Sequence, residues 1–334
     1  MRELYKYFVF SDVHGEYQAL LDALDEAGYD KHNPTHKLVS CGDCFDRGPD
    51  SVKIYRFLKE NKAICVRGNH DNFFIEYLEK GMDGEFVLFN ILHNGLGATI
   101  KSFTGLNDDV FNVNNLDRIR TNISSDVLKW LKSMPLYFET STFLFVHAGV
   151  NPYIRNWMET DEHYMLWDIQ DSHRNIPSLD KICVIGHHHA ARVRANALAE
   201  GLSDYNIADA SYSINYLPSG QSRRKTCRIK AYGNTDENRP FINGNKIAID
   251  GMTNLTGKVN VLVVEDYPNE DPEPKPESPE IKPDNDNITI STTAFRDFGE
   301  VCMEATPGFA QWVYNGDIGG ITYTNDIYTT TFRG

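Results

Sequence analysis

Four short polar motifs contain residue types that bind metal ions, and each follows an apolar stretch. They are Asp12-Val13-His14-Gly15, Gly42-Asp43-Cys44-Phe45-Asp46-Arg47-Gly48, Arg67-Gly68-Asn69-His70-Asp71, and a later pair of loops, Val146-His147-Ala148-Gly149 and Gly186-His187-His188-His189. One histidine after a strand is more often a structural residue than a ligand. Five such loops in one chain are hard to explain structurally, because unpaired buried charge is costly. The set therefore predicts a functional site.

The chemistry that these residues could support is that of two divalent cations. Carboxylate oxygen, imidazole nitrogen and amide oxygen are ligands for Mn²⁺, Fe²⁺ and Zn²⁺. Asp12 and His14 can reach one ion, and Asp43 can bridge it to a second. Three later side chains can complete the second site, namely Asn69, His147 and His187. Two ions about 3.5–4 Å apart activate a bridging hydroxide and clamp a phosphoryl group for in-line attack.

The elements that must position the first three motifs alternate between strand and helix. Three strand–loop–helix units are expected, with strands at 7–10, 38–40 and 63–66 and helices at 17–27, 51–61 and 72–79. This alternation predicts a layered α/β fold. In open α/β sheets, ligands bind at the edge where the strands end, which is where the motifs lie.

Later segments suggest how the rest of the chain is organised. Mostly helical structure is expected over 85–140, followed by strands at 142–146, 182–185, 246–250 and 260–265. We expect a catalytic domain at 1–265 that includes an irregular insert at 190–246. The insert carries a basic cluster, Arg223–Lys230, which is either a solvated loop or a surface for an acidic substrate.

The composition changes abruptly after the last of these strands. Six prolines, eight acidic residues and two lysines lie within 266–286. Such a segment cannot bury apolar area and predicts a semi-stiff linker. Residues 287–334 are rich in threonine and aromatic residues, with strand-like alternation at Ile288–Ser291 and Ile321–Thr324. A small β-rich extension is expected there, which packs on the catalytic domain, forms an oligomer contact or binds a ligand.

Overall composition restricts the classes of function. The 334 residues are 41% hydrophobic and 24% charged, which is ordinary for a folded protein with its own core. The formal net charge of −14 disfavours stable binding to nucleic acid or to an anionic membrane. No apolar run approaches the ~18 residues of a membrane span. Six scattered cysteines indicate reduced thiols and a cytoplasmic location.

The order of the motifs resembles calcineurin-like metallophosphoesterases, and within them the PPP phosphoprotein phosphatases of phages and bacteria. The matching patterns are D-x-H-G, G-D-x-x-D-R-G, R-G-N-H-D, H-A-G and a later G-H. Weaker matches to the family pattern are Asn94-Gly95, Met134-Pro135-Leu136, Leu166-Trp167 and Ile249-Asp250-Gly251. The resemblance runs from about Tyr7 to Glu265. It implies a βαβ sandwich of two mixed sheets flanked by helices.

The resemblance also implies metal ligands and a cofactor. One ion would be held by Asp12, His14 and Asp43. The second would share Asp43 and be held by Asn69, His147 and His187. The expected cofactor is a pair of Mn²⁺ ions, with iron or zinc as the alternatives. His189, in the pattern G-H-x-H, is either a further ligand or a residue near the metals.

Catalytic roles follow from the same resemblance. His70 is expected to be the general acid that protonates the leaving alkoxide. Asp46 is expected to orient His70, raise its pKa and keep it protonated. Arg47 and Arg67 are expected to hold the phosphate oxygens. The implied activity is that of a serine/threonine protein phosphatase, with dual specificity as an extension, acting on a phosphorylated protein or peptide.

Departures from the family pattern leave two alternatives open. Ser11 replaces the usual glycine, with little expected effect. Asp71 is typical of diadenosine tetraphosphate hydrolases, whereas Asp46 favours a phosphomonoesterase. The phosphate-binding arginine expected at Ile169 is absent, and the candidates to replace it are Arg155, Arg174, Arg192 and Arg194.

The first alternative is therefore a nucleotide-directed hydrolase that cleaves diadenosine tetraphosphate or cyclic phosphodiesters. The second is a non-catalytic adaptor. The sequence predicts no oligomeric state.

Overall fold

The computed structural model describes residues 3–106, 115–168, 170–202, 212–216, 225–269, 321–324 and 327–330. The chain divides into two units, Met1–Asp271 and Pro272–Gly334, each of which is described by itself. Within the described part of the second unit, β12 (Ile321–Thr324) and β13 (Ile327–Thr330) pair antiparallel. The strand expected at Ile321–Thr324 is thus confirmed, whereas Ile288–Ser291 lies outside the described residues.

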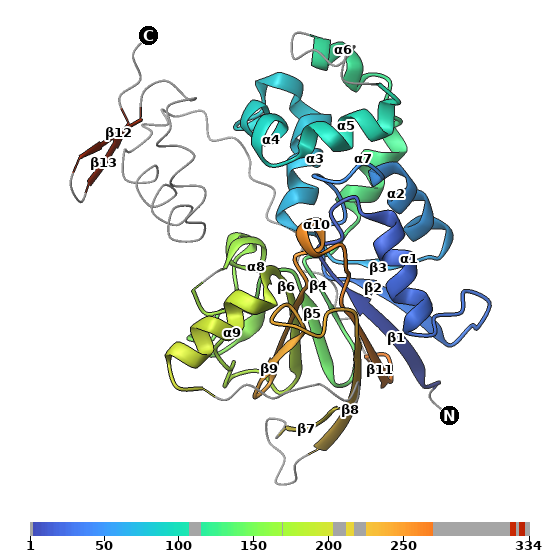
Figure 1. Ribbon diagram of the computed structural model, residues 1–334, viewed down its shortest axis with the longest axis vertical. Helices are drawn as coiled ribbons and strands as arrows, with labels where there is room; N and C mark the ends of the chain where they lie inside the picture. Colours follow the sequence, from blue (N-terminus) through green and yellow to red (C-terminus); the bar gives the residue numbers. More distant parts are fainter. Residues whose placement is uncertain are drawn as a thin grey trace. The chain divides into compact units, whose positions relative to one another are not determined.

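The first unit contains two β-sheets packed face to face (Figure 1). The larger sheet has the strand order β3-β2-β1-β11-β8-β7. Its first three strands in that order are parallel and the other pairings are antiparallel. The strands are β1 (Tyr5–Phe10), β2 (His36–Ser40), β3 (Ile64–Cys65), β7 (Tyr212–Tyr216), β8 (Lys225–Tyr232) and β11 (Val261–Asp266).

The second sheet has the strand order β4-β5-β6-β10-β9. Strands β5, β6 and β10 run parallel, and an antiparallel strand flanks each side. The strands are β4 (Tyr137–Glu139), β5 (Phe143–Val146), β6 (Ile182–His189), β9 (Phe241–Asn243) and β10 (Lys246–Asp250). Both sheets are mixed, which confirms the expected fold.

Helices cover the outer face of each sheet (Figure 1). The larger sheet is covered by the helices that follow β1, β2 and β3 along the chain. They are α1 (Tyr17–Glu26), α2 (Ser51–Glu60), α3 (Asn69–Lys80), α4 (Val87–His93), α5 (Leu96–Thr104), α6 (Leu116–Arg120) and α7 (Ser125–Lys132). The second sheet is covered by α8 (Glu162–Trp167) and α9 (Ala190–Ala199), and the short helix α10 (Thr253–Thr256) follows β10.

Side-chain alternation along the strands builds three apolar layers. In β5, Phe143 and Phe145 point into the core between the sheets, whereas Leu144 and Val146 point towards α8 and α9. In β1, Phe8 packs under the helices of the larger sheet. Each of these side chains is fully buried. Strands with both faces buried have continuous apolar sequences, which is why these strands could be predicted from the sequence.

Two expectations for the later part of the chain are wrong. The segment 190–246 is not irregular, because its described residues form α9, β7, β8 and β9. Strands β7 and β9 lie at sheet edges and β8 lies between β11 and β7, and alternation is a weak signal in such strands. Asp266 is not part of the expected linker, because it ends β11 and is paired with Tyr5, and residues 270–286 lie outside the described residues. The Asp266 carboxylate accepts hydrogen bonds from the Thr140 hydroxyl and the Thr142 amide, both at 2.7 Å.

Within the described segments, no helix has both the length and the apolar character needed to cross a membrane.

Candidate metal centre and active site

Strand register brings the first three motifs to one edge of the larger sheet. Phe10 of β1 is paired with Ser40 of β2, which is paired with Cys65 of β3. Each motif begins one or two residues after these partners. Three separate segments therefore deliver their polar side chains to the same place, as expected for parallel strands.

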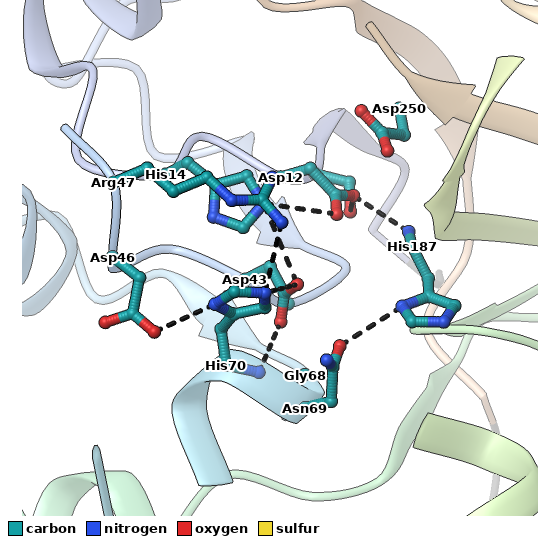
Figure 2. Close-up of polar contacts among 12 residues, drawn as sticks. Asp12, His14, Asp43, Asp46, Arg47, Gly68, Asn69, His70, His187 and Asp250 are labelled. Carbon is teal, nitrogen blue, oxygen red and sulfur yellow. Dashed lines mark hydrogen bonds and ion pairs between the residues drawn. The ribbon is translucent and has the colours of Figure 1, made fainter. Parts of the chain in front are cut away.

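The second sheet presents its histidines at a matching edge. Val146 of β5 is paired with Ile185 of β6, which is paired with Ala248 of β10. His147 and His187 follow directly from this row. The β6–β10 register then shifts, and His187 adopts a positive φ of 60°. Figure 2 shows the His187 ring facing Asn69, while the backbone amide of His187 donates to Asp12.

Backbone strain is concentrated at these residues. Asp12, His14 and Asp43 have φ values of 52°, 47° and 54°, in the left-handed region that non-glycine residues rarely adopt. Asp46 and Arg47 share this conformation, at 72° and 65°. Left-handed residues of this kind cluster at functional sites, where the surrounding fold enforces them.

Two glycines permit a close approach between the motifs. A Cβ atom on Gly68 would overlap the Asp43 carboxylate. A Cβ atom on Gly186 would overlap the Asp12 carboxylate and the Ser11 hydroxyl. The carboxylates of Asp12 and Asp43, which are candidate metal ligands, therefore lie directly against the backbone of neighbouring loops, which explains the glycines in these motifs.

One group of candidate ligands surrounds His14. Its Nδ1 donates to the Phe45 carbonyl at 2.9 Å, which leaves Nε2 free to bind a cation. Nε2 lies 3.9 Å from Asp12 Oδ1 and 3.8 Å from Asp43 Oδ2. All three side chains are buried. This is the group expected to hold the first ion.

A second group surrounds His147 and shares Asp43. His147 Nδ1 donates to the Cys41 carbonyl at 2.8 Å, so Nε2 is again the free nitrogen. Nε2 lies 2.9 Å from Asn69 Oδ1 and 3.4 Å from Asp43 Oδ1. His187 Nδ1 lies 3.1 Å from the same Asn69 oxygen. All six expected metal ligands are therefore brought together, in two groups joined by Asp43.

Electrostatics at this cluster fit bound cations. Burial raises the pKa of both Asp12 and Asp43 well above the usual range, and nearby carboxylates raise them further. Burial lowers the pKa of His147 to about 4 and holds those of His14 and His187 well below their ordinary value. Close carboxylates beside neutral imidazoles form a donor set that a divalent cation stabilises. The residues present fit the expected pair of metal ions.

His70 and Asp46 form a buried pair next to the first group. His70 lies in the first turn of α3, and its Nδ1 is 2.8 Å from Asp46 Oδ2. The other Asp46 oxygen accepts from the Thr99 hydroxyl at 2.6 Å, and that hydroxyl accepts from the Asp46 amide at 2.8 Å. Thr99 belongs to α5 and was missed in the sequence, because no spacing links it to residue 46.

The protonation state of His70 differs from the expectation. The expectation was that Asp46 raises the pKa of His70, whereas burial and the Arg47 guanidinium hold that pKa well below its usual value. Burial also raises the pKa of Asp46 to about 8. Arg47 Nη2 lies 3.2 Å from His70 Nε2 and donates to it. Because a guanidinium can only donate, His70 Nε2 is the acceptor in this contact.

The two arginines of the motifs have different surroundings. Arg47 is exposed and points towards the Asp12–Asp43 cluster (Figure 2). Its loop is held by Gly95 at the start of α5, whose carbonyl accepts from the Arg47 amide at 3.2 Å. Arg67 is mostly buried and contacts Glu162 of α8. Its second contact is the Met134 carbonyl, at 3.1 Å.

Asp71, Arg174 and Arg194 make structural contacts and do not line the site. Asp71 is fully buried and accepts from the Gly68 and Asp43 amides at 2.8 and 3.1 Å, so it fixes the loops that carry the ligands. Arg174 pairs with Glu200 and Asp171, and Arg194 binds backbone carbonyls of 237–240. Neither replaces the expected phosphate-binding arginine, and Ile169 lies outside the described residues.

His189 lies next to a carboxylate. Its Nε2 is 3.8 Å from Asp250 Oδ2, and Asp250 is itself buried close to Asp12. Figure 2 shows Asp250 at the border of the cluster, beyond Asp12. Among the described residues, two groups of His, Cys, Asp or Glu donor atoms lie close enough to hold an ion, and neither contains His189, Asp250 or Asp12. They are His14, Asp43 and His70, and Asp43, His147 and His187.

Comparison with known families identifies the class of protein. The sequence profile of the calcineurin-like phosphoesterases matches residues 5–195, more than half of the chain. The chain therefore belongs to the calcineurin-like phosphoesterase family, a family of hydrolases, as its motifs suggested.

Two of the similar proteins are named for different activities. The chain is 29% identical over 157 residues to bis(5'-nucleosyl)-tetraphosphatase PrpE (asymmetrical) of Bacillus velezensis, a match that covers 43% of this chain and 56% of that protein. It is 37% identical over 81 residues to serine/threonine-protein phosphatase 2 of Escherichia coli K12, covering 24% and 36%. The matches thus span about half of these relatives or less.

A solved metallophosphoesterase from Sphaerobacter thermophilus is also similar. It superposes with a TM-score of 0.34 at 19% identity, over 56% of this chain and 62% of that chain.

Proposed function

We propose that the protein is a phosphomonoesterase with two metal ions, and that phosphoserine, phosphothreonine and also phosphotyrosine in proteins are its leading substrates. The observation that carries the proposal is the buried contact between His70 and Asp46, at 2.8 Å. An alkoxide leaving group needs a proton in the transition state, and a positioned imidazole can supply it. A nucleotide leaving group needs this help much less.

The metal ions would be held by the two groups around Asp43. Asp12, His14 and Asp43 would hold one ion, and Asp43, Asn69, His147 and His187 the other. Mn²⁺ is the first candidate, with iron and zinc as alternatives. When bound, these ions would activate water and stabilise negative charge on the phosphoryl group.

His70 would become the acid only when substrate enters. Arg47 donates to His70 Nε2 and thereby occupies the nitrogen that must carry the proton. A phosphate dianion is a stronger partner for a guanidinium than a neutral imidazole is. Once phosphate draws Arg47 away, Nε2 can take up a proton, and the nearby negative charge favours the imidazolium. Asp46 would hold the ring towards the leaving oxygen.

A nucleotide-directed hydrolase is the second candidate, and two observations favour it. The first is the similarity to the Bacillus velezensis tetraphosphatase. The second is a pair of partly exposed aromatic rings, Phe73 and Trp167, whose centroids are 5.7 Å apart. Phe73 contacts His70 and Trp167 contacts His187. A planar base could stack on such rings.

The adaptor alternative has less support. A protein that had lost catalysis would be expected to have lost ligands, whereas all six expected ligands and His70 lie together.

A substrate panel tests the proposal. Chelator-stripped protein would be assayed with and without Mn²⁺ on an aryl phosphate, phosphoserine and phosphotyrosine peptides, diadenosine tetraphosphate and a 2′,3′-cyclic nucleotide. The proposal expects Mn²⁺-dependent turnover with the highest kcat/KM on the peptides. Higher values on the nucleotides would favour the second candidate, and no turnover with metal bound would revive the adaptor.

A further inference from the structure

Arg67 has unused hydrogen-bonding capacity beside the metal centre. Its Nη2 donates to the Met134 carbonyl, and its Nη1 is 3.4 Å from Glu162 Oε1. Its Nε is buried and meets no acceptor among the described residues. A buried guanidinium with a spare donor is costly unless a ligand completes it, and two N–H groups of a guanidinium match two oxygens of phosphate.

Glu162 neutralises part of the charge that Arg67 could offer to phosphate. The glutamate is the first residue of α8, and its side chain is half exposed, at 50%. The 3.4 Å separation is long for a charge-assisted hydrogen bond. Such a pair contributes little and can be exchanged easily. The other end of α8 carries Trp167, which contacts the metal-ligand candidate His187.

We propose that Glu162 competes with the substrate phosphate for Arg67 and thereby sets the affinity of the site for phosphoesters. The inference rests on the proposed function, in which Arg67 binds phosphate. In the free protein, the glutamate carboxylate takes the place of one phosphate oxygen at Nη1. Entry of a phosphate dianion releases Glu162 to solvent, and Nη1 then donates to a phosphate oxygen in its place. Glu162 is a specificity-determining residue and takes no part in the chemical step.

The matched pair of variants is Glu162→Gln and Glu159→Gln. Glu159 is an exposed glutamate of the preceding 3₁₀ helix (Trp157–Glu159), and its side chain contacts that of Asn156 at 3.3 Å, not Arg67. Both substitutions remove one negative charge from the same surface. Mn²⁺-loaded full-length protein would be titrated calorimetrically with inorganic phosphate, and KM and kcat would be measured on the best substrate of the panel.

We expect Glu162→Gln to tighten phosphate binding and lower KM by about two- to fivefold, the range of a weak surface ion pair, with kcat unchanged. Glu159→Gln should leave all three quantities within about 1.5-fold of the wild-type values, because screened charges act weakly at a distance. In an Arg67→Ala background, Glu162→Gln should have no effect, because the glutamate acts through that arginine.

Any of the following results would overturn the proposal. Unchanged or weaker phosphate binding in Glu162→Gln would mean that the glutamate positions Arg67 without competing. An equal gain in phosphate affinity in Glu159→Gln would show that the effect comes from general surface charge. A wild-type protein that binds no phosphate and turns over no substrate would overturn the proposed function as well. Normal turnover with unchanged affinity in Glu162→Gln would overturn this inference alone.

Discussion

At the scale of single residues, the site depends on how two buried side chains share a proton. Burial and the Arg47 guanidinium lower the pKa of His70 well below its usual value. Burial raises the pKa of its partner Asp46 to about 8. The pair can therefore hold one proton between them near neutral pH, and substrate binding would decide which atom carries it.

Replacing His70 should affect substrates according to their leaving groups. We expect His70→Asn to lower kcat on a phosphoserine peptide by about 10²–10⁴-fold, the usual contribution of a general acid. The loss on an aryl phosphate should be much smaller, because its phenolate needs little protonation. The exposed His32, replaced by asparagine in the same way, is the control. Equal losses on both substrates would contradict the assignment.

Thr99 should be needed to hold Asp46 in place. Thr99→Val keeps the shape but removes the hydroxyl that both donates to and accepts from Asp46. Misplaced catalytic groups lose rate steeply, so kcat on the peptide should fall by about 10- to 100-fold, and Thr99→Ser should restore it.

The control for Thr99 is Thr104→Val in the same helix, α5. The Thr104 hydroxyl contacts only backbone carbonyls of its own helix. If both valine variants lose the same activity, the effect reflects α5 stability and not the position of Asp46.

At the scale of elements, the site is where loops from both sheets approach very closely. Gly68 precedes α3 and lies against Asp43, so a methyl group there must push the bridging carboxylate aside. We expect Gly68→Ala to lower Mn²⁺ affinity and kcat/KM by at least about tenfold, since displacements near 1 Å have large effects on catalysis.

Gly149→Ala is the matched control for that substitution. Gly149 follows His147 in a similar loop, but an added Cβ would meet the nearest atom, Asp168 Oδ2, at an ordinary 3.4 Å. Activity should stay close to the wild-type value. If calorimetry shows that Gly68→Ala binds Mn²⁺ as tightly as the wild type, the prediction is contradicted. Asp43 could then shift without a loss of metal affinity.

The elements were predictable to different degrees. Fully buried strands such as β1 and β5 are short apolar runs, and the motifs after them could be placed at the sheet edge from the sequence. The sequences of the polar strands β7 and β8 and of the helix α9 show no clear hydrophobic periodicity, so the region 190–246 was expected to be irregular. Contacts between distant elements, such as Arg67 with Glu162, depend on tertiary packing, and no spacing in the chain encodes them.

At the scale of the whole molecule, the catalytic unit should fold without the C-terminal unit. Asp266 and Tyr267 tie β11 to the β4–β5 turn, where Ser141 N donates to the Tyr267 carbonyl at 2.9 Å. We expect a fragment of residues 1–271 to unfold cooperatively at the melting temperature of the catalytic unit in the full chain.

A fragment of residues 1–265 is the matched comparison. It lacks the buried carboxylate of Asp266 and should lose at least about 2 kcal/mol, which corresponds to roughly 4–8 °C in Tm for a domain of this size. Thermal denaturation followed by circular dichroism measures both fragments. An insoluble 1–271 fragment would show that the C-terminal unit is part of the catalytic fold.

The pH dependence of metal binding can be derived from the pKa shifts at the cluster. Burial raises the pKa of Asp12 and Asp43, so these carboxyl groups must release protons before they can bind a cation. Burial lowers the pKa of His14, His147 and His187, so the imidazoles are already neutral and compete little. Apparent Mn²⁺ affinity should therefore rise with pH as the carboxyl groups ionise.

Calorimetric titration of the chelator-stripped protein with Mn²⁺ at pH 6, 7 and 8 tests the central claim most directly. The wild type and Asp22→Asn, a change of an exposed carboxylate on α1, should each bind two ions, more tightly as the pH rises. Asp43→Asn should fold normally but lose both the binding and the Mn²⁺-dependent turnover. Two tightly bound ions in an active Asp43→Asn variant, or no Mn²⁺ binding by the wild type, would contradict the claim that Asp43 joins a dinuclear metal centre.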